Sequence, residues 1–411
     1  MAIVTTLAVL ELARRLDAYT AGMLRVPMAV LAATALAWWF LLRVPPSNSL
    51  RGRRVLITGA AHGLGEELAL QAASRGATLV LWDIDGEALA GVVARAREAL
   101  RATGHPVGEA DARAVLGKAF DISDEGALCA ARDEALRVGM DIDSVISGAA
   151  ILQGGVRAAA LTGAQLARTL AVNLGGPLAL LRNLLPHLSA GLAKAPEARR
   201  TLCFVSSLMG TGMGAQGLAD YTASKAGLNA AVECLRQEVN AEEALSGRLG
   251  VHLVCPWVLD TDMFKGAFTS KRAPLLERCF LRAVPPLRRG AVAAHILDGL
   301  AFRHGAHWVT FRPFFMRFAA YLPRLLLAPS VGLYDALMGA IGGARGMELW
   351  QGSEWNRRQC SSSSSSSGGV GAGGGRAAGG AAAVLAAAAP SAGAAAAGEA
   401  DAAAQAEPSE K

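Results

Sequence analysis

Hydrophobic positions follow three different patterns along the chain. Residues 26–42 are seventeen uncharged, mostly apolar residues between Arg25 and Arg43. Between residues 54 and 310, short aliphatic or β-branched runs alternate with alanine- and leucine-rich stretches of helical length. After residue 358, serine, glycine and alanine dominate and the apolar patterning ends. In chain order, these patterns predict a membrane helix, an α/β domain and a disordered tail.

The middle pattern predicts a doubly wound Rossmann fold with a seven-stranded parallel sheet, because strands that alternate with helices pair through crossovers. Right-handed crossovers then place the functional loops at the carboxyl ends of the strands. One domain is expected over residues 51–312, and its strands are predicted at 54–58, 78–82, 118–121, 144–147, 201–205, 251–255 and 307–310.

Residues 1–50 are predicted to form an amino-terminal membrane anchor around the apolar run. As a helix, this run would extend about 26 Å, slightly less than the roughly 30 Å hydrocarbon core of a bilayer. Trp38 and Trp39 suit the membrane interface. A cleaved signal peptide is disfavoured because Glu11 and Asp17 lie in a long preceding region. A soluble core helix is the other alternative, and a spanning anchor is not distinguished from one in a single leaflet.

The net charge of +6 is concentrated at the same end of the chain. Residues 1–54 carry seven basic and two acidic side chains, a difference of +5. Basic residues beside an apolar run are typical of a membrane surface, so membrane lipid rather than nucleic acid is the expected partner. More arginines follow the run than precede it, which predicts that the rest of the chain faces the cytosol. The six cysteines are scattered and predict neither a metal site nor a disulfide framework.

Two further segments follow the last predicted strand. Residues 313–358 are apolar and are interrupted by Pro323 and Pro329. They are predicted as short helices at the membrane surface or over the site, or alternatively as an ordinary pair of core helices. Residues 359–411 form a low-complexity tail that is expected to be disordered.

A glycine turn follows the first predicted strand. The sequence from Thr58 to Gly65 reads TGAAHGLG and precedes a stretch of helical composition. Gly59 would permit the tight turn, Gly63 the approach of a pyrophosphate, and Gly65 the close packing of helix on strand. Asp83 ends the second strand, where its carboxylate would accept hydrogen bonds from ribose hydroxyls and repel a 2′-phosphate. The predicted cofactor is therefore NAD rather than NADP.

The second chemical signal is the pair Tyr221 and Lys225, which share a helix face at a spacing of four residues. A nearby ammonium favours the phenolate and would lower the pKa of Tyr221, so that the phenol can exchange a proton with an alcohol. The strand predicted at 201–205 ends in Ser206 and Ser207 and brings a hydroxyl to the same edge of the sheet.

Together these motifs resemble the short-chain dehydrogenase/reductase family over roughly residues 51–312. The matching segments, in the family's order, are TGAAHGLG, Asp83, Asp121-Ile122, AVNLGG with Asn173, SSLMG, YTASK, and CPWVLDTDMF with Pro256 and Thr261. The resemblance implies that Tyr221 exchanges the proton, Lys225 lowers its pKa and binds the nicotinamide ribose, and Ser207 hydrogen-bonds the substrate oxygen. It also implies a relay water at Asn173. The cofactor-binding residues that it implies are Thr58, Gly59, Gly63, Leu64, Gly65, Asp83, Asp121, Ile122, Tyr221, Lys225, Pro256, Val258 and Thr261, with Asp121 facing the adenine.

Two departures from the family pattern concern the site. The residues Ser147-Gly148-Ala149-Ala150 replace the family's NNAG, which removes amide side chains that brace the cofactor site, so cofactor affinity rather than the fold would be affected. Ser207 precedes Tyr221 by 14 positions, one more than the family interval, and Ser206 is the alternative catalytic hydroxyl.

The segments LWDID and CPWVLDTDMF, with the anchor, look like the membrane-associated retinol and 17β-hydroxysteroid dehydrogenase branch of the family. The expected activity is NAD-dependent interconversion of an alcohol and a carbonyl on a retinoid, a steroid or a long-chain lipid. The branch implies the endoplasmic reticulum or a lipid droplet, with the catalytic domain facing the cytosol; a homodimer is a further family expectation. The alternatives are an NADPH-dependent 3-keto lipid reductase and a non-catalytic nucleotide-sensing scaffold. Apolar residues after Pro256 would cover the substrate, or in part pack in the core, namely Met263, Phe264, Phe268, Leu275, Leu276 and Phe280.

Overall fold

The computed structural model describes Glu11, residues 49–104, 114–211, 214–264 and 285–302, and the backbone of 308–312. The anchor predicted around residues 26–42, the apolar extension 313–358 and the tail 359–411 lie outside these residues. Within the described residues, no helix combines the length and the apolar character needed to cross a membrane.

One parallel sheet of seven strands forms the centre of the fold, in the order β3-β2-β1-β4-β5-β6-β7. The α/β class and the parallel sheet predicted from the sequence are confirmed. Because β1 lies between β2 and β4, the chain reverses its direction of winding there, which creates a switch point at the carboxyl end of β1. The strands are β1 (Arg54–Thr58), β2 (Thr78–Asp83), β3 (Val115–Ala119), β4 (Ser144–Ser147), β5 (Arg200–Val205), β6 (Leu249–Pro256) and β7 (Trp308–Arg312).

The predicted bounds differ from those of the structure for five strands: by one residue at one end for β2 and β5, by one or two residues at each end for β6 and β7, and most for β3. β3 begins three residues before the predicted segment 118–121 and ends at Ala119. It pairs only with β2 in the described sheet and is mostly exposed after Val115, so little apolar signal marks it in the sequence. β6 extends beyond the predicted 251–255 at both ends because it pairs with β5 on one side and β7 on the other.

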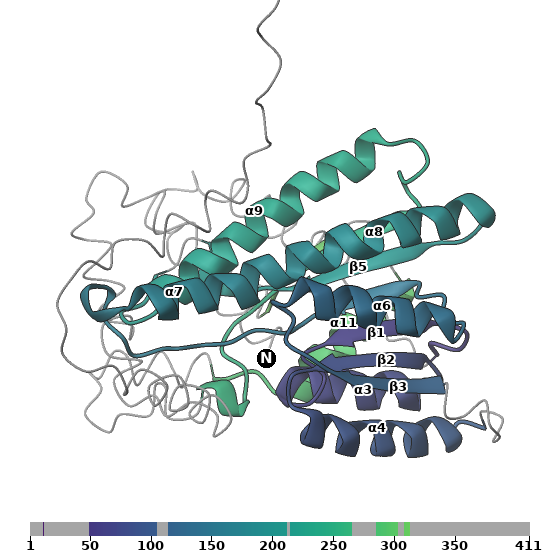
Figure 1. Ribbon diagram of the computed structural model, residues 1–411, viewed down its shortest axis with the longest axis horizontal. Helices are drawn as coiled ribbons and strands as arrows, with labels where there is room; N and C mark the ends of the chain where they lie inside the picture. Colours follow the sequence, from purple (N-terminus) through teal and green to yellow (C-terminus); the bar gives the residue numbers. More distant parts are fainter. Residues whose placement is uncertain are drawn as a thin grey trace, which may run out of the picture. The chain divides into compact units, whose positions relative to one another are not determined.

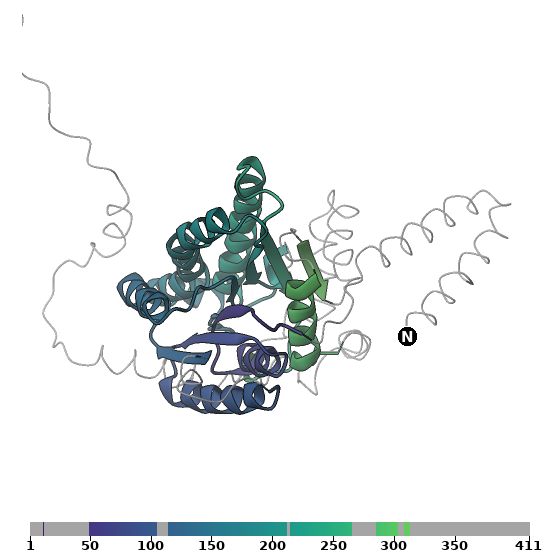
Figure 2. The same ribbon diagram turned by 90° about the vertical axis from the view of Figure 1, so that its right-hand side faces the viewer.

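Helices cover both faces of the sheet (Figure 1). One face carries α3 (Gly63–Ser74), α4 (Gly86–Arg101) and α11 (Arg289–Phe302), and the other carries α6 (Glu125–Arg137), α8 (Gly176–Lys194) and α9 (Ala219–Ala241). Figure 2 shows the same two layers from the side.

Side chains that alternate along the strands contribute to two hydrophobic cores, one on each face of the sheet. On β1, Leu56 belongs to the core beneath α6, α8 and α9, whereas Ile57 belongs to the core beneath α3, α4 and α11. Successive side chains of a strand point to opposite faces, which explains why β1 reads as a continuous apolar run. Both residues are completely buried.

Shorter elements complete the rim of the site. They are the turn η1 (Ala158–Ala160), the helix α7 (Gly163–Leu170), the π turn η2 (Ala171–Gly175), and the 3₁₀ turns η3 (Leu208–Thr211) and η4 (Asp262–Phe264). Thr162 begins α7 with a reciprocal capping box to Gln165. The π turn joins α7 to α8 without a break and contains Asn173.

Candidate active site

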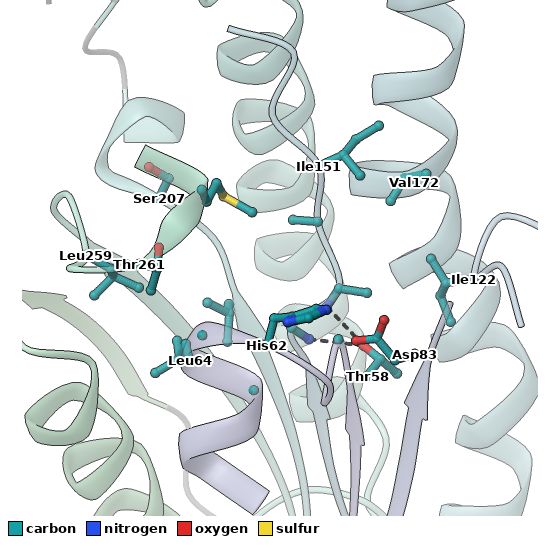
Figure 3. Close-up of a pocket in the computed structure, with 18 of the residues that line it drawn as sticks. Thr58, His62, Leu64, Asp83, Ile122, Ile151, Val172, Ser207, Leu259 and Thr261 are labelled. Atoms are coloured by element: carbon teal, nitrogen blue, oxygen red, sulfur yellow. Dashed lines mark hydrogen bonds between the residues drawn. The ribbon is translucent and has the colours of Figure 1, made fainter. Parts of the chain in front are cut away.

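A cavity of about 440 Å³ lies at the carboxyl ends of the strands (Figure 3). Figure 3 shows Ile122 on one side of it, Leu259 and Thr261 on the opposite side, and Asp83 beside His62. The residues predicted from the sequence that line the cavity are Thr58, Gly59, Gly63, Leu64, Gly65, Asp83, Asp121, Ile122, Ser207, Tyr221, Lys225, Pro256 and Thr261. The fold therefore brings the glycine turn and the Tyr221 cluster to one cavity.

The glycine turn is closed by contacts that exclude larger residues. Gly59 has a positive φ of 73°, and a Cβ there would lie 2.8 Å from the Cα of Ala149. A Cβ on Gly65 would collide with the carbonyl oxygen of Gly59. Gly63 also has a positive φ, of 57°, and faces the side chain of Thr261. The two roles predicted for Gly59 and Gly65, turn and close packing, are consistent with this geometry.

Asp83 holds the glycine turn against β2, a role that the sequence did not reveal. Its Oδ2 accepts the backbone N–H of Ala61 at 2.9 Å, and its Oδ1 accepts the backbone N–H of Asp85 at 3.0 Å. The N–H of Gly59 also donates to the carbonyl oxygen of Trp82 at 2.8 Å. The carboxylate thus orders the two loops between which a ribose would bind, and each oxygen retains a lone pair for a hydroxyl.

His62, which lines the cavity, is hydrogen-bonded to Asp85. The Nε2 of His62 lies 2.9 Å from the Oδ2 of Asp85, whose Oδ1 caps α4 by accepting the N–H of Ala88 at 3.1 Å. Desolvation raises the pKa of Asp85, but the hydrogen bonds from Ala88 and His62 outweigh it and hold that pKa below its usual value. This second acid adds negative charge beside Asp83.

The loop after β4 is braced by Thr58 instead of by amide side chains. The Oγ1 of Thr58 accepts the N–H of Gly148 at 3.1 Å and of Ala149 at 3.2 Å. A Cβ on Gly148 would lie 2.9 Å from the carbonyl oxygen of Thr58. The sequence that replaces the family's NNAG therefore packs closely on β1.

Asp121, which follows β3 and lines the cavity, is committed to a side-chain network. Its Oδ1 accepts the N–H and the hydroxyl of Ser123, and its Oδ2 lies 2.7 Å from a guanidinium nitrogen of Arg168. Desolvation raises the pKa of Asp121, but the hydrogen bonds from Arg168 and Ser123 lower it below the usual value. Arg168 lines the cavity as well, and no sequence motif marked it.

Tyr221, Ser207 and Lys225 form the polar centre of the cavity. The side chain of Ser207 lies close enough to the phenol of Tyr221 to lower its pKa, although the interval between the two is 14 positions. The Nζ of Lys225 lies 5.9 Å from the centre of the Tyr221 ring and donates to the carbonyl oxygen of Val205 at 3.0 Å. Ser206 also lines the cavity, but its hydroxyl donates to the carbonyl oxygen of Lys225 at 3.4 Å. Ser207, not Ser206, is therefore the hydroxyl paired with the phenol.

Burial controls the protonation of this centre. Desolvation raises the pKa of Tyr221 to about 12, and the hydrogen bond from Ser207 only partly opposes that rise. Desolvation lowers the pKa of Lys225 to about 8. The structure thus raises the pKa of Tyr221, where the sequence predicted a lowered one, because the phenol is buried and the Lys225 ammonium donates to the carbonyl of Val205.

Two predicted site residues do not line the cavity. Asn173 is fully buried in the π turn, where its Oδ1 accepts the N–H of Ile151 at 2.8 Å and its Nδ2 donates to the carbonyl oxygen of Ile151 and to Ser224. It thereby fixes the loop after β4 at Ile151, which lines the cavity. Val258 is buried, and its carbonyl oxygen accepts the N–H of Leu287 at 2.8 Å. Its neighbours Trp257 and Leu259 line the cavity instead.

Apolar side chains line part of the cavity. Met263 and Phe264, which were predicted to cover a substrate, line it together with Ile151, Val172 and Trp257. The other predicted covering residues, from Phe268 to Phe280, lie outside the described residues. Among the residues that the structure describes, no group of three metal-ligating side chains occurs.

Comparison with known proteins agrees with this geometry. The sequence pattern of the family described as short chain dehydrogenase matches residues 53–272. Epidermal retinol dehydrogenase 2 of Homo sapiens is 28% identical over 306 residues, covering 74% of this chain and 89% of that protein. Retinol dehydrogenase 10-B of Danio rerio is 30% identical over 239 residues, covering 56% of this chain and 67% of that protein.

A solved structure shows the same fold. The short-chain type dehydrogenase/reductase from Mycobacterium ulcerans superimposes with a TM-score of 0.53 at 19% sequence identity. The match covers 71% of this chain and 99% of that chain.

Proposed function

This chain belongs to the short-chain dehydrogenase/reductase family, in its retinol dehydrogenase-like branch, and we propose that it is an NAD-dependent enzyme that interconverts an alcohol and a carbonyl on a lipophilic molecule. Members of this family bind nicotinamide cofactors and act on CH–OH groups. The observation that carries the proposal is that Ser207, Tyr221 and Lys225 line one cavity together with the glycine turn.

The residues present fit a dinucleotide. Gly63 and Gly65 leave no Cβ at two positions of the first turn of α3, where a pyrophosphate would meet backbone N–H groups and the positive end of the helix dipole. Asp83 at the end of β2 supports NAD, because it offers carboxylate oxygens where a 2′-phosphate would be repelled. Asp85 beside it strengthens that repulsion.

The chain's own residues would carry the proton chemistry. A bound nicotinamide supplies the acceptor or donor of the hydride. Ser207 orients the substrate oxygen, and the Oη of Tyr221 gives a proton to it during reduction or takes one from it during oxidation. Lys225, whose pKa of about 8 leaves it mostly protonated at neutral pH, contributes positive charge that favours the phenolate. The apolar lining excludes water from this exchange.

The lining also supports the substrate class. Ile151, Trp257, Met263 and Phe264 offer apolar and aromatic surface beside the reacting groups, which suits a retinoid, a steroid or a long-chain alcohol. The names of the two similar retinol dehydrogenases agree with that class.

We also propose that residues 1–50 anchor the enzyme in the endoplasmic reticulum or lipid-droplet membrane, from which such substrates enter. This proposal rests on the uncharged run and its flanking arginines.

Activity of the full chain in detergent tests the proposal. We expect NAD reduction with at least one alcohol from a panel of retinols, hydroxysteroids and long-chain alcohols. Tyr221→Phe should lose at least about a hundredfold in kcat/KM and retain NADH binding, measured by nicotinamide fluorescence. Wild-type protein that binds NADH and turns over none of the panel would count against the proposed substrates, and an unimpaired Tyr221→Phe variant against the proposed mechanism.

A further inference from the structure

Arg289 lines the cavity beside the glycine turn, although no motif marked it. It is the first residue of α11, and its side chain is 46% exposed. The amino end of α11 is fixed against α3: Gln71 on α3 donates to the carbonyl oxygen of Gly290 at 3.0 Å, and a Cβ on Gly290 would lie 3.1 Å from a carboxylate oxygen of Glu67. The backbone that carries Arg289 therefore lies against the middle of α3, beside Glu67 and Gln71.

Glu66 occupies the first turn of α3 and also lines the cavity. Its Oε1 accepts a hydrogen bond from Arg95 at 2.8 Å, whereas its Oε2 lies 3.7 Å from the nearest nitrogen of Arg289. The second contact is longer than a hydrogen bond. Arg95 therefore holds Glu66 firmly, and Arg289 is attached to it only by a loose charge contact.

The other cations that line the described part of the cavity have closer partners. Arg168 is hydrogen-bonded to Asp121 and Ser123, and Lys225 donates to the carbonyl oxygen of Val205. His62 lies 2.9 Å from Asp85. Arg289 is thus the lining cation whose guanidinium can move at the smallest loss of existing contacts.

We propose that Arg289 turns from Glu66 to the pyrophosphate of the bound dinucleotide and donates charge-assisted hydrogen bonds to it. Arg95 keeps Glu66 paired, so the carboxylate at the amino end of α3 does not repel the phosphates once Arg289 has moved. The inference rests on the proposed function only in taking a dinucleotide as the ligand. It adds a phosphate-binding residue from α11 to a site that otherwise offers backbone N–H groups.

A simpler role for Arg289 would be to neutralise Glu66 from a distance. The two roles differ in what the removal of Glu66 does. If Arg289 only neutralises Glu66, replacing Arg289 has no effect once Glu66 is Gln. If Arg289 binds phosphate, its replacement weakens binding in both backgrounds.

Binding to the full-length protein in detergent tests the proposal with NADH, ADP-ribose and adenosine as probes. We expect Arg289→Gln to raise the Kd of NADH and of ADP-ribose about tenfold, in the wild-type and in the Glu66→Gln background, and to leave the Kd of adenosine unchanged. It should also make the Kd of ADP-ribose less dependent on salt. Arg95→Gln is the matched comparison, because it also removes a charge from Glu66 but lies outside the cavity: it should raise these Kd values less than about threefold, and its effect should disappear in the Glu66→Gln background because Arg95 acts only through Glu66.

The outcomes separate this inference from the proposed function. Equal effects of Arg289→Gln and Arg95→Gln, or an effect of Arg289→Gln that disappears in the Glu66→Gln background, would overturn the phosphate role. Wild-type protein that binds ADP-ribose with the expected dependence on Arg289, yet turns over no alcohol, would overturn the proposed function and support this inference. Wild-type protein that binds neither NADH nor ADP-ribose would overturn both.

Discussion

Ser207 and Tyr221 line the same cavity, with the serine side chain close enough to lower the pKa of the phenol, across an interval of 14 positions. Ser207 follows the carboxyl end of β5, and Tyr221 lies in the first turn of α9. The short turn Leu208–Thr211 takes up part of the chain between them. The longer interval therefore leaves the reacting hydroxyls together.

The two adjacent serines should differ in their effects on catalysis. Ser207→Ala removes the hydroxyl that contacts the phenol and would orient the substrate oxygen, so kcat/KM should fall about a hundredfold. Ser206→Ala removes only a 3.4 Å hydrogen bond to the carbonyl of Lys225 and should cost less than about fivefold. Steady-state kinetics on both variants measure this difference; a larger loss in Ser206→Ala would assign the substrate oxygen to Ser206.

The two directions of the reaction should depend on pH in opposite ways. Because burial raises the pKa of Tyr221 to about 12, the phenol is protonated at neutral pH and is ready to donate during carbonyl reduction. Alcohol oxidation needs the phenolate, so its kcat/KM should rise from pH ~7 to pH ~9, whereas that of reduction should not rise. Initial rates in both directions across this range test the expectation. An oxidation rate that is flat with pH would contradict the raised pKa.

The buried Lys225 ammonium should lower the free energy of unfolding at neutral pH. Its pKa falls from 10.5 unfolded to about 8 folded, so the unfolded chain binds more protons between these values and stability rises with pH across that window. Below pH ~8 the penalty for the buried ammonium is complete. Lys225→Met should therefore lose activity yet gain on the order of 1 kcal/mol of unfolding free energy at pH ~7. Denaturant unfolding at pH ~7 and ~10 measures it, and a variant less stable than wild type at pH ~7 would contradict the penalty.

Asp83→Ala should impair NAD binding as well as cofactor choice. The ratio of kcat/KM with NADP to that with NAD should rise, because the repelling carboxylate is gone. The variant also loses both hydrogen bonds that hold Ala61 and Asp85, so affinity for NAD should fall about tenfold and the fold should lose about 1–2 kcal/mol. Kinetics with both cofactors and thermal unfolding test the two effects. If the variant used NAD as efficiently as the wild-type enzyme, Asp83 would neither bind the ribose nor order the loops that hold it.

The sequence predicted those parts of the site that local spacing determines. Gly59, Gly63 and Gly65 follow an apolar strand directly, and Tyr221 and Lys225 share one helix, so their chemistry can be recognised within a few residues. The parallel sheet then places both groups at one edge.

The remaining parts depend on contacts between distant segments. Three such contacts appear only after the chain has folded. They are the hydrogen bond from Ala61 to Asp83, the side-chain hydrogen bonds of Asn173 to Ile151, and the position of Arg289 beside α3. The protonation of Tyr221 was predicted in the wrong direction for a related reason. The sequence shows its charged neighbour at a spacing of four but not the complete burial that outweighs it.

Two glycines offer a paired test of the turn geometry. Gly65→Ala would drive a Cβ into the carbonyl oxygen of Gly59, so the turn would have to open. We expect a loss of about 3 kcal/mol in unfolding free energy and no measurable NADH binding. Gly91→Ala is the control, because Gly91 is exposed within α4 and a Cβ there meets no atom within 4 Å. That variant should gain about 0.5–1 kcal/mol from helix propensity and bind NADH as wild type does. If Gly65→Ala bound NADH normally, the close approach of α3 to the Gly59 carbonyl would not be needed for phosphate binding. The proposed role of Gly65 would then be wrong.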